Sequence, residues 1–342
     1  MSTDTWSLYT LMKKSRLFEE AVGRLWHEGL ISGEMHLGTG EEAIVAGVVS
    51  QLEPGDAMAL DHRGTAALLM RGCDPVLLLR ELLGREDGLC GGWGGHMHLA
   101  SKEHLASCSG IVGAAGPTAV GFALAAESLR PGAIAVAFFG EGAVNQGMLM
   151  ESIHLAAEWN LPVLFVCKDD GWAITTQRGP LFDESLADRV RGLGARYLSV
   201  DGVEVEEVWR AGQNALERAR AGKGPTFLHA RCVHLEGHFL GFMLLRMTRN
   251  PFRGGPGMTA SLARSLLTPG GGTLRERLAG LRRVLSTLLA TLRDPRQKPS
   301  NDPLTRARLA LLTDPARLQA LEAQLQEDVS AIVVAALQEA AA

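Results

Sequence analysis

A chain of 342 residues that is 46% hydrophobic and 21% charged has the size and composition of a globular protein with one large domain or two smaller ones. Its net charge of −4 argues against nucleic-acid binding, and it holds no run of about 18 apolar residues that could span a membrane. The five cysteines form no CxxC pair and the first residues carry no signal or transit pattern, so we expect a reduced, cytoplasmic protein.

Helical and strand patterns alternate from the first residues onward. Apolar residues at helical spacing predict a helix over 6–30, and a loop within 36–52 leads into a second helix. The stretch 57–72 predicts a short strand, a turn and a helix. The segment 84–100 carries six glycines, which predicts a loop whose backbone comes close to another group.

The next part of the chain has the pattern of a parallel sheet. Two of its apolar runs are unbroken, as in strands that are covered on both faces. The expected strands are 133–140, 162–168, 197–202 and 225–233, and the expected helices are 110–127, 146–159 and 205–221. This alternation predicts an α/β fold with a mostly parallel sheet and helices on both faces.

The segment 239–300 has a different composition, with eleven Lys and Arg residues against two acids. Leucines recur in it at spacings of four and three, which predicts one amphipathic helix: Leu274, Leu278, Leu281, Leu285, Leu288 and Leu292. We expect this leucine seam to pack against its own subunit or a partner, although its basic flanks leave a membrane surface as an alternative. The predicted division is 1–238 as an α/β domain, 239–301 as a basic helical insertion and 302–342 as C-terminal helices.

Acidic side chains follow two of the expected strands. Glu141 comes directly after one strand, and Asp169 and Asp170 come after the next, with one helix between them. The carboxyl ends of parallel strands meet at one edge of a sheet, where ligands bind. Amides at 142–145 open a helix and can seat phosphate oxygens, and carboxylates beside a phosphate require a cation such as Mg²⁺. The alternative is that these acids only cap helices.

Several separate stretches resemble the alpha subunit of the two-chain 2-oxo acid dehydrogenases, the decarboxylating components that use thiamine diphosphate. Glu141 and Asp170 are placed like the family's Gly-Asp-Gly and Asn-Asn motif. The resemblance covers about 6–238 and, weakly, 302–342, and its glycine loop is similar to that of the pyruvate and acetoin branch. It is carried by 16-RLFEEAVGRLWHEGLISGEMHLGTGEEA-43, 71-RGCDPVLLLRELLGREDGLCGGWGGHMH-98, 110-GIVGAAGP-117, 140-GEGAVNQG-147 and 236-EGH-238.

The resemblance implies a thiamine-diphosphate-binding fold with a metal site and two catalytic residues. Mg²⁺ would be held by the side chains of Glu141 and Asp170 and by the carbonyl of Trp172. His36 and His238 match histidines that face the reacting centre. The family has Asp, Asn and Tyr where this chain has Glu141, Asp170 and Trp172, so the metal site differs from the family pattern.

The resemblance also implies contacts to the organic cofactor. Arg63 would contact the diphosphate, and His62 replaces a tyrosine beside it. Asn145 would support the diphosphate loop. The remaining cofactor contacts would come from the backbone of Gly110, Val112, Gly140, Gly142 and Ala143. By contrast His96 and His98, which have no third ligand near them in the sequence, are interpreted as loop contacts rather than a zinc site.

The implied reaction needs partners. The family places an activating acid on a beta subunit, so we expect an alpha2beta2 heterotetramer, a small 2-oxo acid substrate and acyl transfer to a lipoyl-bearing acyltransferase. Thr65 stands where the family usually has a histidine, and an apolar run follows His238 in place of a polar loop. We expect 239–300 to dock near the cofactor entrance instead of that loop. These departures leave two alternatives: a degenerate, non-catalytic interaction subunit, or another thiamine-diphosphate lyase or transferase.

Overall fold

The computed structural model describes residues 4–179, 182–241, 264, 273–293 and 298–338. Within these ranges no helix combines the length and the apolar character needed to cross a bilayer.

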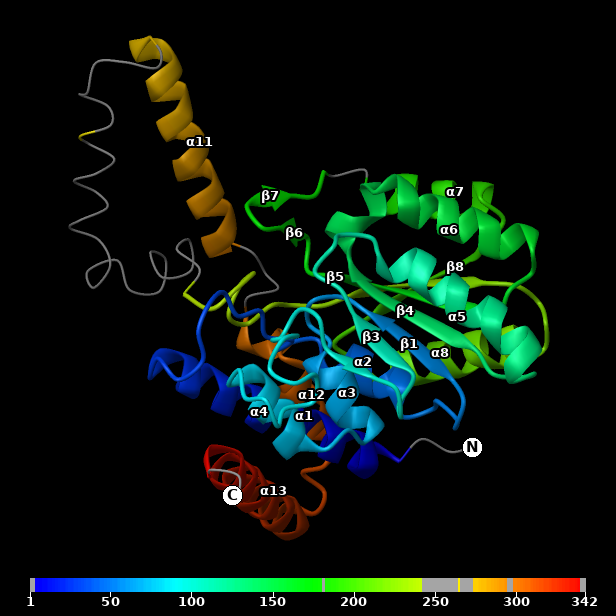
Figure 1. Cartoon of the computed structure of the whole chain (residues 1–342). Helices are drawn as coiled ribbons and strands as arrows, with labels where there is room; N and C mark the ends of the chain where they lie inside the picture. The colour runs from blue at the N-terminus through cyan, green and yellow to red at the C-terminus, as the bar shows by residue number, and fades with distance from the viewer. Residues whose placement is uncertain (1–3, 180–181, 242–263, 265–272, 294–297, 339–342) are drawn as a thin grey trace.

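One seven-stranded sheet forms the centre of the protein (Figure 1). Its order is β2-β3-β1-β4-β5-β9-β8, and every neighbouring pair is parallel except β2 with β3. The predicted α/β class with a mostly parallel sheet is confirmed. The strands are β1 (Ala57–Leu60), β2 (Ala100–Ser101), β3 (Ala106–Cys108), β4 (Ala135–Gly140), β5 (Val163–Asp169), β8 (Arg196–Asp201) and β9 (Thr226–Arg231), with a separate hairpin of β6 (Trp172–Ala173) and β7 (Thr176–Gln177).

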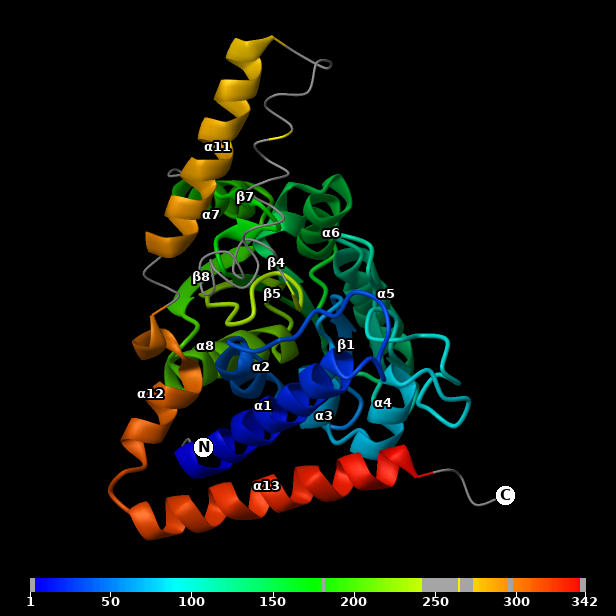
Figure 2. The ribbon, with the colours of Figure 1, turned by 90° about the vertical axis from the view of Figure 1, so that its left-hand side faces the viewer.

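Helices cover both faces of the sheet, as predicted (Figures 1 and 2). One face carries α5 (Ala115–Leu129), α6 (Gly147–Glu158) and α7 (Phe182–Gly192), whose apolar residues share a core with alternate residues of β4 and β5. The helices of the other layer are α1 (Thr5–His27), α2 (Glu42–Val49), α3 (Thr65–Arg71), α4 (Pro75–Leu82) and α8 (Val205–Arg220). Strand β5 shows why both layers are needed, because Leu164 and Val166 enter one core and Phe165 and Cys167 the other.

The C-terminal helices pack on the α/β domain. Helices α12 (Pro303–Ala310) and α13 (Pro315–Leu337) place Leu304 and Leu318 in the same core as α1 and α2. Arg16 of α1 pairs with Glu42 at 2.5 Å and with Asp302 at 2.9 Å, which joins α1, α2 and the start of α12. Helices α12 and α13 therefore contribute to the core of the α/β domain.

The amphipathic helix predicted in the basic segment is present where the structure describes that segment. Helix α11 (Leu274–Arg293) covers the whole leucine seam, and it extends from the α/β domain beside the β6–β7 hairpin (Figures 1 and 2). Leu278 and Leu285 are about half exposed, so at these positions the seam does not pack against the described part of its own subunit. Residues 242–263 and 265–272, where the apolar run continues, lie outside the described residues, and docking of this segment stays a prediction.

The backbone of the glycine-rich loop, residues 84–100, packs around the buried carboxylate of Glu81. Glu81 of α4 is fully buried, and its two oxygens accept hydrogen bonds from the amides of Cys90, Gly92, Gly94 and Gly95 at 2.7–3.1 Å. A side chain at Gly88 could not fit, because its Cβ would lie 2.6 Å from the Glu81 backbone. The expected close approach is therefore real, and its partner is a side chain of the same chain.

Candidate active site

The carboxyl ends of four adjacent strands enclose a cavity of about 370 Å³. Strand β1 ends before Asp61–Arg63, β4 before Glu141, β5 before Asp170 and β9 before the loop to His238. Its lining includes every predicted site residue except Asn145: His36, His62, Arg63, Gly110, Val112, Gly140, Glu141, Gly142, Ala143, Asp170, Trp172 and His238. Residues separated by up to 202 positions are thus brought to one crevice at the predicted edge of the sheet.

Asn145 lies apart from this group. It ends the short 3₁₀ helix η1 (Glu141–Asn145), is exposed, and its side-chain oxygen accepts a hydrogen bond from Arg189 of α7 at 3.1 Å. The structure therefore places Asn145 between η1 and α7, outside the cavity lining, and its role in supporting the loop stays a prediction.

Glu141 is a buried acid without a hydrogen-bond partner for one oxygen. Its side chain is 4% exposed, and Oε1 bonds to no group among the described residues. Burial raises the pKa of Glu141 well above its usual value, and the negative charges of Asp170 and Asp169 raise it further. The ionised form of this carboxyl is therefore disfavoured in the free protein.

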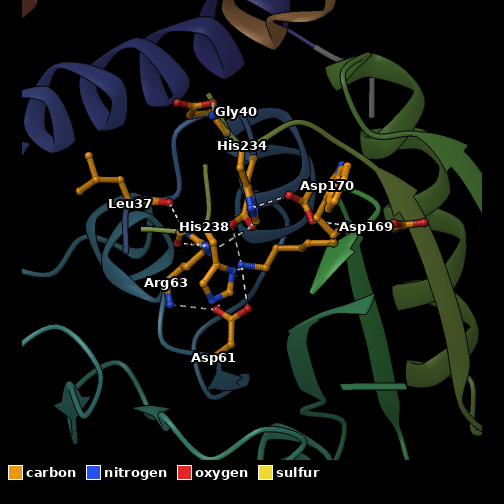
Figure 3. Close-up of polar contacts among 12 residues, drawn as sticks. Leu37, Gly40, Asp61, Arg63, Asp169, Asp170, His234 and His238 are labelled. Carbon is orange, nitrogen blue, oxygen red and sulfur yellow. Dashed lines mark hydrogen bonds and ion pairs between the residues drawn. The ribbon is translucent and has the colours of Figure 1, made fainter. Parts of the chain in front are cut away.

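Asp169 and Asp170, adjacent in sequence, face opposite sides of the sheet because strand side chains alternate. Asp169 accepts hydrogen bonds from Arg178 at 2.6 Å and from the ring of His229 at 2.7 Å, outside the cavity lining. Asp170 lines the cavity and lies 3.0 Å from Nδ1 of His234 (Figure 3). Burial opposes ionisation of Asp170, but His234 and Arg63 outweigh it and hold the pKa of Asp170 below its usual value.

These donors fit a hard divalent cation. Glu141 offers an unpartnered buried oxygen beside a second carboxylate, and carboxylate and carbonyl oxygens are the ligands that Mg²⁺ takes. A cation between the two acids would remove the repulsion that now raises the pKa of Glu141. The residues present are therefore able to hold the metal that the sequence predicts.

A chain of buried ion pairs continues from Asp170 to the floor of the cavity (Figure 3). His234 Nε2 lies 2.6 Å from Glu41, the other oxygen of Glu41 lies 2.6 Å from Lys168 Nζ, and Lys168 lies 3.1 Å from Asp61. Burial alone would raise the pKa of Glu41, but Lys168 and His234 hold that pKa well below its usual value. The sequence analysis missed Glu41, Lys168 and His234. Their only signal was that each lies close to a strand end or to a quoted motif.

This chain of ion pairs includes a group, His234, that can balance the extra negative charge of Asp170. Burial and Arg63 oppose protonation of His234, but Asp170 and Glu41 outweigh both and raise the pKa of His234. His234, whose charged form these two acids favour, lies 3.0 Å from Asp170, which stands at the position of the family's asparagine. A group that can balance the extra charge of Asp170 is therefore present within the same chain.

Arg63 is fixed by backbone carbonyls. Its guanidinium donates to the carbonyl of Leu37 and to that of His238, the latter at 2.6 Å, and its side chain is buried (Figure 3). The loops that carry His36 and His238 are thus tied to the loop after β1. Arg63 is the cation of the cavity lining.

Four histidines meet at the cavity. His36 and His238 are joined there by His62, and His36 Nδ1 lies 3.0 Å from Nε2 of His96. Burial is the main cause that lowers their pKa values, to about 2 for His36, about 3 for His238 and about 4 for His62 and His96. All four rings are therefore neutral at pH 7. Of the pair His96 and His98, only His96 reaches this group, since His98 is exposed.

A further buried acid, Glu19 of α1, lies behind the loop that carries His36. Its carboxylate is 1% exposed, and neither oxygen has a hydrogen-bond partner within the described residues. Burial, followed by the charge of Glu42, raises the pKa of Glu19 to about 8 from the ordinary 4.5. Glu19 is therefore protonated in the folded protein at neutral pH and ionised in the unfolded chain.

This difference predicts a pH-dependent stability. Above pH 4.5 the unfolded chain releases the Glu19 proton while the folded protein keeps it, so the free energy of unfolding falls as pH rises. The loss is about 1.4 kcal/mol per pH unit, or on the order of 3 kcal/mol between pH 5 and pH 7. Denaturant unfolding of Glu19→Gln should lack this component, and Glu20→Gln, at an exposed neighbouring position, should keep it. If the free energy of unfolding depends on pH in the same way in the wild type and in Glu19→Gln, Glu19 is not the group that causes this dependence.

The sequence of this chain is similar to a known protein family and to several known proteins. A family model described as dehydrogenase E1 component matches residues 10–241. The chain is 40% identical over 238 residues to the alpha subunit of an acetoin:2,6-dichlorophenolindophenol oxidoreductase of Cupriavidus necator, covering 69% of this chain and 71% of the relative. It is 38% identical over 240 residues to the protein of the same description in Bacillus subtilis, covering 68% and 71%. It is 39% identical over 234 residues to the pyruvate dehydrogenase E1 component subunit alpha of Zymomonas mobilis, covering 67% and 66%.

Proposed function

Because this chain belongs to the dehydrogenase E1 component family, as an alpha subunit of a 2-oxo acid dehydrogenase, we propose that it binds thiamine diphosphate and Mg²⁺ and decarboxylates a small 2-oxo acid, as the alpha subunit of an enzyme of the pyruvate or acetoin dehydrogenase type. The observation that carries the proposal is the pair Glu141 and Asp170. Two buried carboxyl groups at the ends of adjacent parallel strands face one cavity, and one of them has an oxygen without a partner.

The proposed site divides its tasks among the lining residues. Glu141, Asp170 and the carbonyl of Trp172 would hold Mg²⁺, and Arg63 would contact the diphosphate. The remaining contacts would come from backbone groups of Gly110, Val112, Gly140, Gly142 and Ala143. When bound, thiamine diphosphate supplies an electron sink for carbon–carbon cleavage. The chain's own residues position the cofactor and balance its charge.

His36 and His238 would move protons at the reacting centre. Burial and the nearby Arg63 lower the pKa of both rings, so each is neutral at pH 7 and keeps a nitrogen lone pair. Arg63 holds the backbone at both positions through its bonds to Leu37 and His238. The guanidinium thus orients the two rings while it keeps them unprotonated.

Exposed apolar side chains around the cavity support a partner subunit there. Ile111 is 64% exposed, Val112 53% and Ile174 51%, and all three line the cavity. Trp93, in the glycine-rich loop, is 93% exposed. Because large apolar side chains gathered at one place mark interaction surfaces, we propose that a beta subunit covers the cavity mouth in an alpha2beta2 heterotetramer. A lipoyl-bearing acyltransferase would then receive the acyl group.

The purified chain alone is expected to decarboxylate no 2-oxo acid and to gain activity when a beta subunit is added. The reason is that the resemblance places the activating acid on the beta subunit, whereas the acids at the inner end of this cavity are paired, Asp170 with His234 and both Glu41 and Asp61 with Lys168. Carbon dioxide release from pyruvate and its homologues measures this. Turnover by the isolated chain contradicts it.

A calorimetric titration with thiamine diphosphate and Mg²⁺ tests the proposed function itself. Metal-dependent binding, strengthened by a beta subunit, supports the decarboxylating subunit. No binding even in the complex favours the degenerate, non-catalytic alternative. Binding followed by release of a free aldehyde or ketol, without transfer to a lipoyl group, favours another lyase or transferase.

A further inference from the structure

Three imidazoles converge at the cavity on the side where His36 and His238 lie. One ring nitrogen from each of His36, His62 and His238 lies within 4.8 Å of one from each of the other two. The ring of His36 meets those of His62 and His238 edge to face, with centroids 4.6 Å and 5.1 Å apart. The three residues come from separate loops, before α2, after β1 and after β9, so only the fold assembles this arrangement.

Two of the three rings have a nitrogen that can offer a lone pair to an ion. Nε2 of His62 is buried and has no hydrogen-bond partner within the described residues. Nδ1 of His36 lies 3.0 Å from Nε2 of His96. If Nδ1–H donates there, the tautomer of His36 is fixed with the lone pair on Nε2. A metal-bound histidine commonly donates its second ring N–H to a fixed acceptor in this way.

The cavity lining carries groups of both charges: Arg63 and His234 lie there among five carboxyl groups, Glu34, Glu41, Asp61, Glu141 and Asp170. The three converging histidines are neutral, because burial and then chiefly Arg63 lower the pKa values of His36 and His238 and burial lowers that of His62. No proton has to leave these rings at neutral pH before an ion binds.

We propose that His36, His62 and His238 form a binding site for one divalent transition-metal ion of the zinc class, separate from the carboxylate pair. Three imidazoles with a fourth position open to a cavity are a common ligand set for Zn²⁺. Ion–nitrogen distances of about 2.0–2.1 Å in a tetrahedral site put the nitrogens roughly 3.4 Å apart. The loops therefore need to close by at most about 1.4 Å from the present separation.

Such an ion would act as an inhibitor of the proposed decarboxylation, and this consequence rests on the proposed function. His36 and His238 cannot accept a proton while their lone pairs bind a metal. Mg²⁺ prefers oxygen ligands and is expected to stay at Glu141 and Asp170. The two ions therefore occupy different parts of one cavity.

The test is metal binding by the full chain, without any assay of activity. The purified protein is stripped with a chelator and titrated with Co²⁺, whose visible spectrum reports tetrahedral coordination, and with Zn²⁺ in competition with a chromogenic chelator. One equivalent is expected to bind. His62→Asn and His36→Asn should each weaken Zn²⁺ binding by at least about 100-fold, and His96→Phe by about 10- to 100-fold. His98→Asn, on the same loop as His96 but exposed, should bind as the wild type does.

Two further variants separate this proposal from the proposed cofactor site. Glu141→Ala should lose Mg²⁺-dependent binding of thiamine diphosphate and keep one equivalent of Zn²⁺. His238→Asn, checked by thermal unfolding like the other variants, gives a second ligand test in case His62→Asn does not fold. The proposal is overturned if the stripped wild type binds no stoichiometric ion, or if the folded His62→Asn or His238→Asn proteins bind Zn²⁺ with unchanged affinity.

Discussion

Replacing Glu141 with alanine is expected to abolish Mg²⁺-dependent binding of thiamine diphosphate while the chain stays folded. Glu141 offers the buried carboxylate oxygen without a hydrogen-bond partner, and burial together with Asp170 and Asp169 raises its pKa. Mg²⁺ relies on such oxygens, so loss of this ligand should weaken cofactor binding by at least about 100-fold. Calorimetric titration of the cofactor at saturating Mg²⁺ measures the effect.

Folding and specificity both have controls in this experiment. The free protein should not be destabilised by loss of the carboxyl, because burial and the charges of Asp170 and Asp169 disfavour its ionised form and its Oε1 has no hydrogen-bond partner within the described residues. Glu151→Ala, on the exposed side of α6, removes an acid close in sequence and should bind the cofactor as the wild type does. If Glu141→Ala binds the cofactor with unchanged affinity, the carboxylate pair is not the metal site and the central argument for the function fails.

Replacing Lys168 with methionine is expected to destabilise the fold by about 3–5 kcal/mol. Lys168 is 1% exposed, and its ammonium lies 2.6 Å from Glu41 and 3.1 Å from Asp61. Methionine has a similar length but no charge, so it leaves two carboxylates without their shared cation, and Glu41 is fully buried. Denaturant unfolding at pH 7 measures the change.

A double-mutant cycle shows whether this loss comes from the ion pair. Glu41→Gln should lower the free energy of unfolding less in the Lys168→Met background than in the wild type. In the wild type this substitution leaves the Lys168 ammonium without one of its carboxylate partners, whereas in the Lys168→Met background that ammonium is absent. Lys102→Met, at an exposed lysine between β2 and β3, should change stability by less than about 0.5 kcal/mol. Additive effects of Lys168→Met and Glu41→Gln would show that the two side chains do not interact energetically.

The elements of the fold and the edge that carries the site follow from local sequence patterns. Unbroken apolar runs identify β4 and β5, because a strand covered on both faces needs apolar residues at successive positions. The helix between them makes the two strands parallel, and their carboxyl ends must then meet. Glu141 and Asp170 could therefore be placed at one cavity without the structure. The alternation of strand side chains also separates Asp169 from Asp170.

The electrostatics of the site depend on contacts that no local pattern contains. Glu41, Lys168 and His234 lie on a loop, a strand and a second loop far apart in the sequence, and a charged residue next to a motif looks the same whether it is paired or solvated. Only packing brings them together, and it thereby places His234 beside Asp170. The same holds for the three histidines, whose ring nitrogens converge because β1 and β9 end at the same edge.

The leucine seam is another feature that local sequence predicts only in part. Spacings of four and three residues determine that Leu274–Leu292 form one face of a helix, and α11 confirms this. What covers that face depends on surfaces elsewhere, and Leu278 and Leu285 remain half exposed in this chain. The sequence alone determined most of the helices, the central strands and the position of the acids, because these follow from periodicity along the chain, whereas α7 and the short strands β2, β3, β6 and β7 were not predicted. The tertiary structure decided which charges are paired, which acids are protonated and which rings converge, because those properties depend on distances between residues remote in sequence.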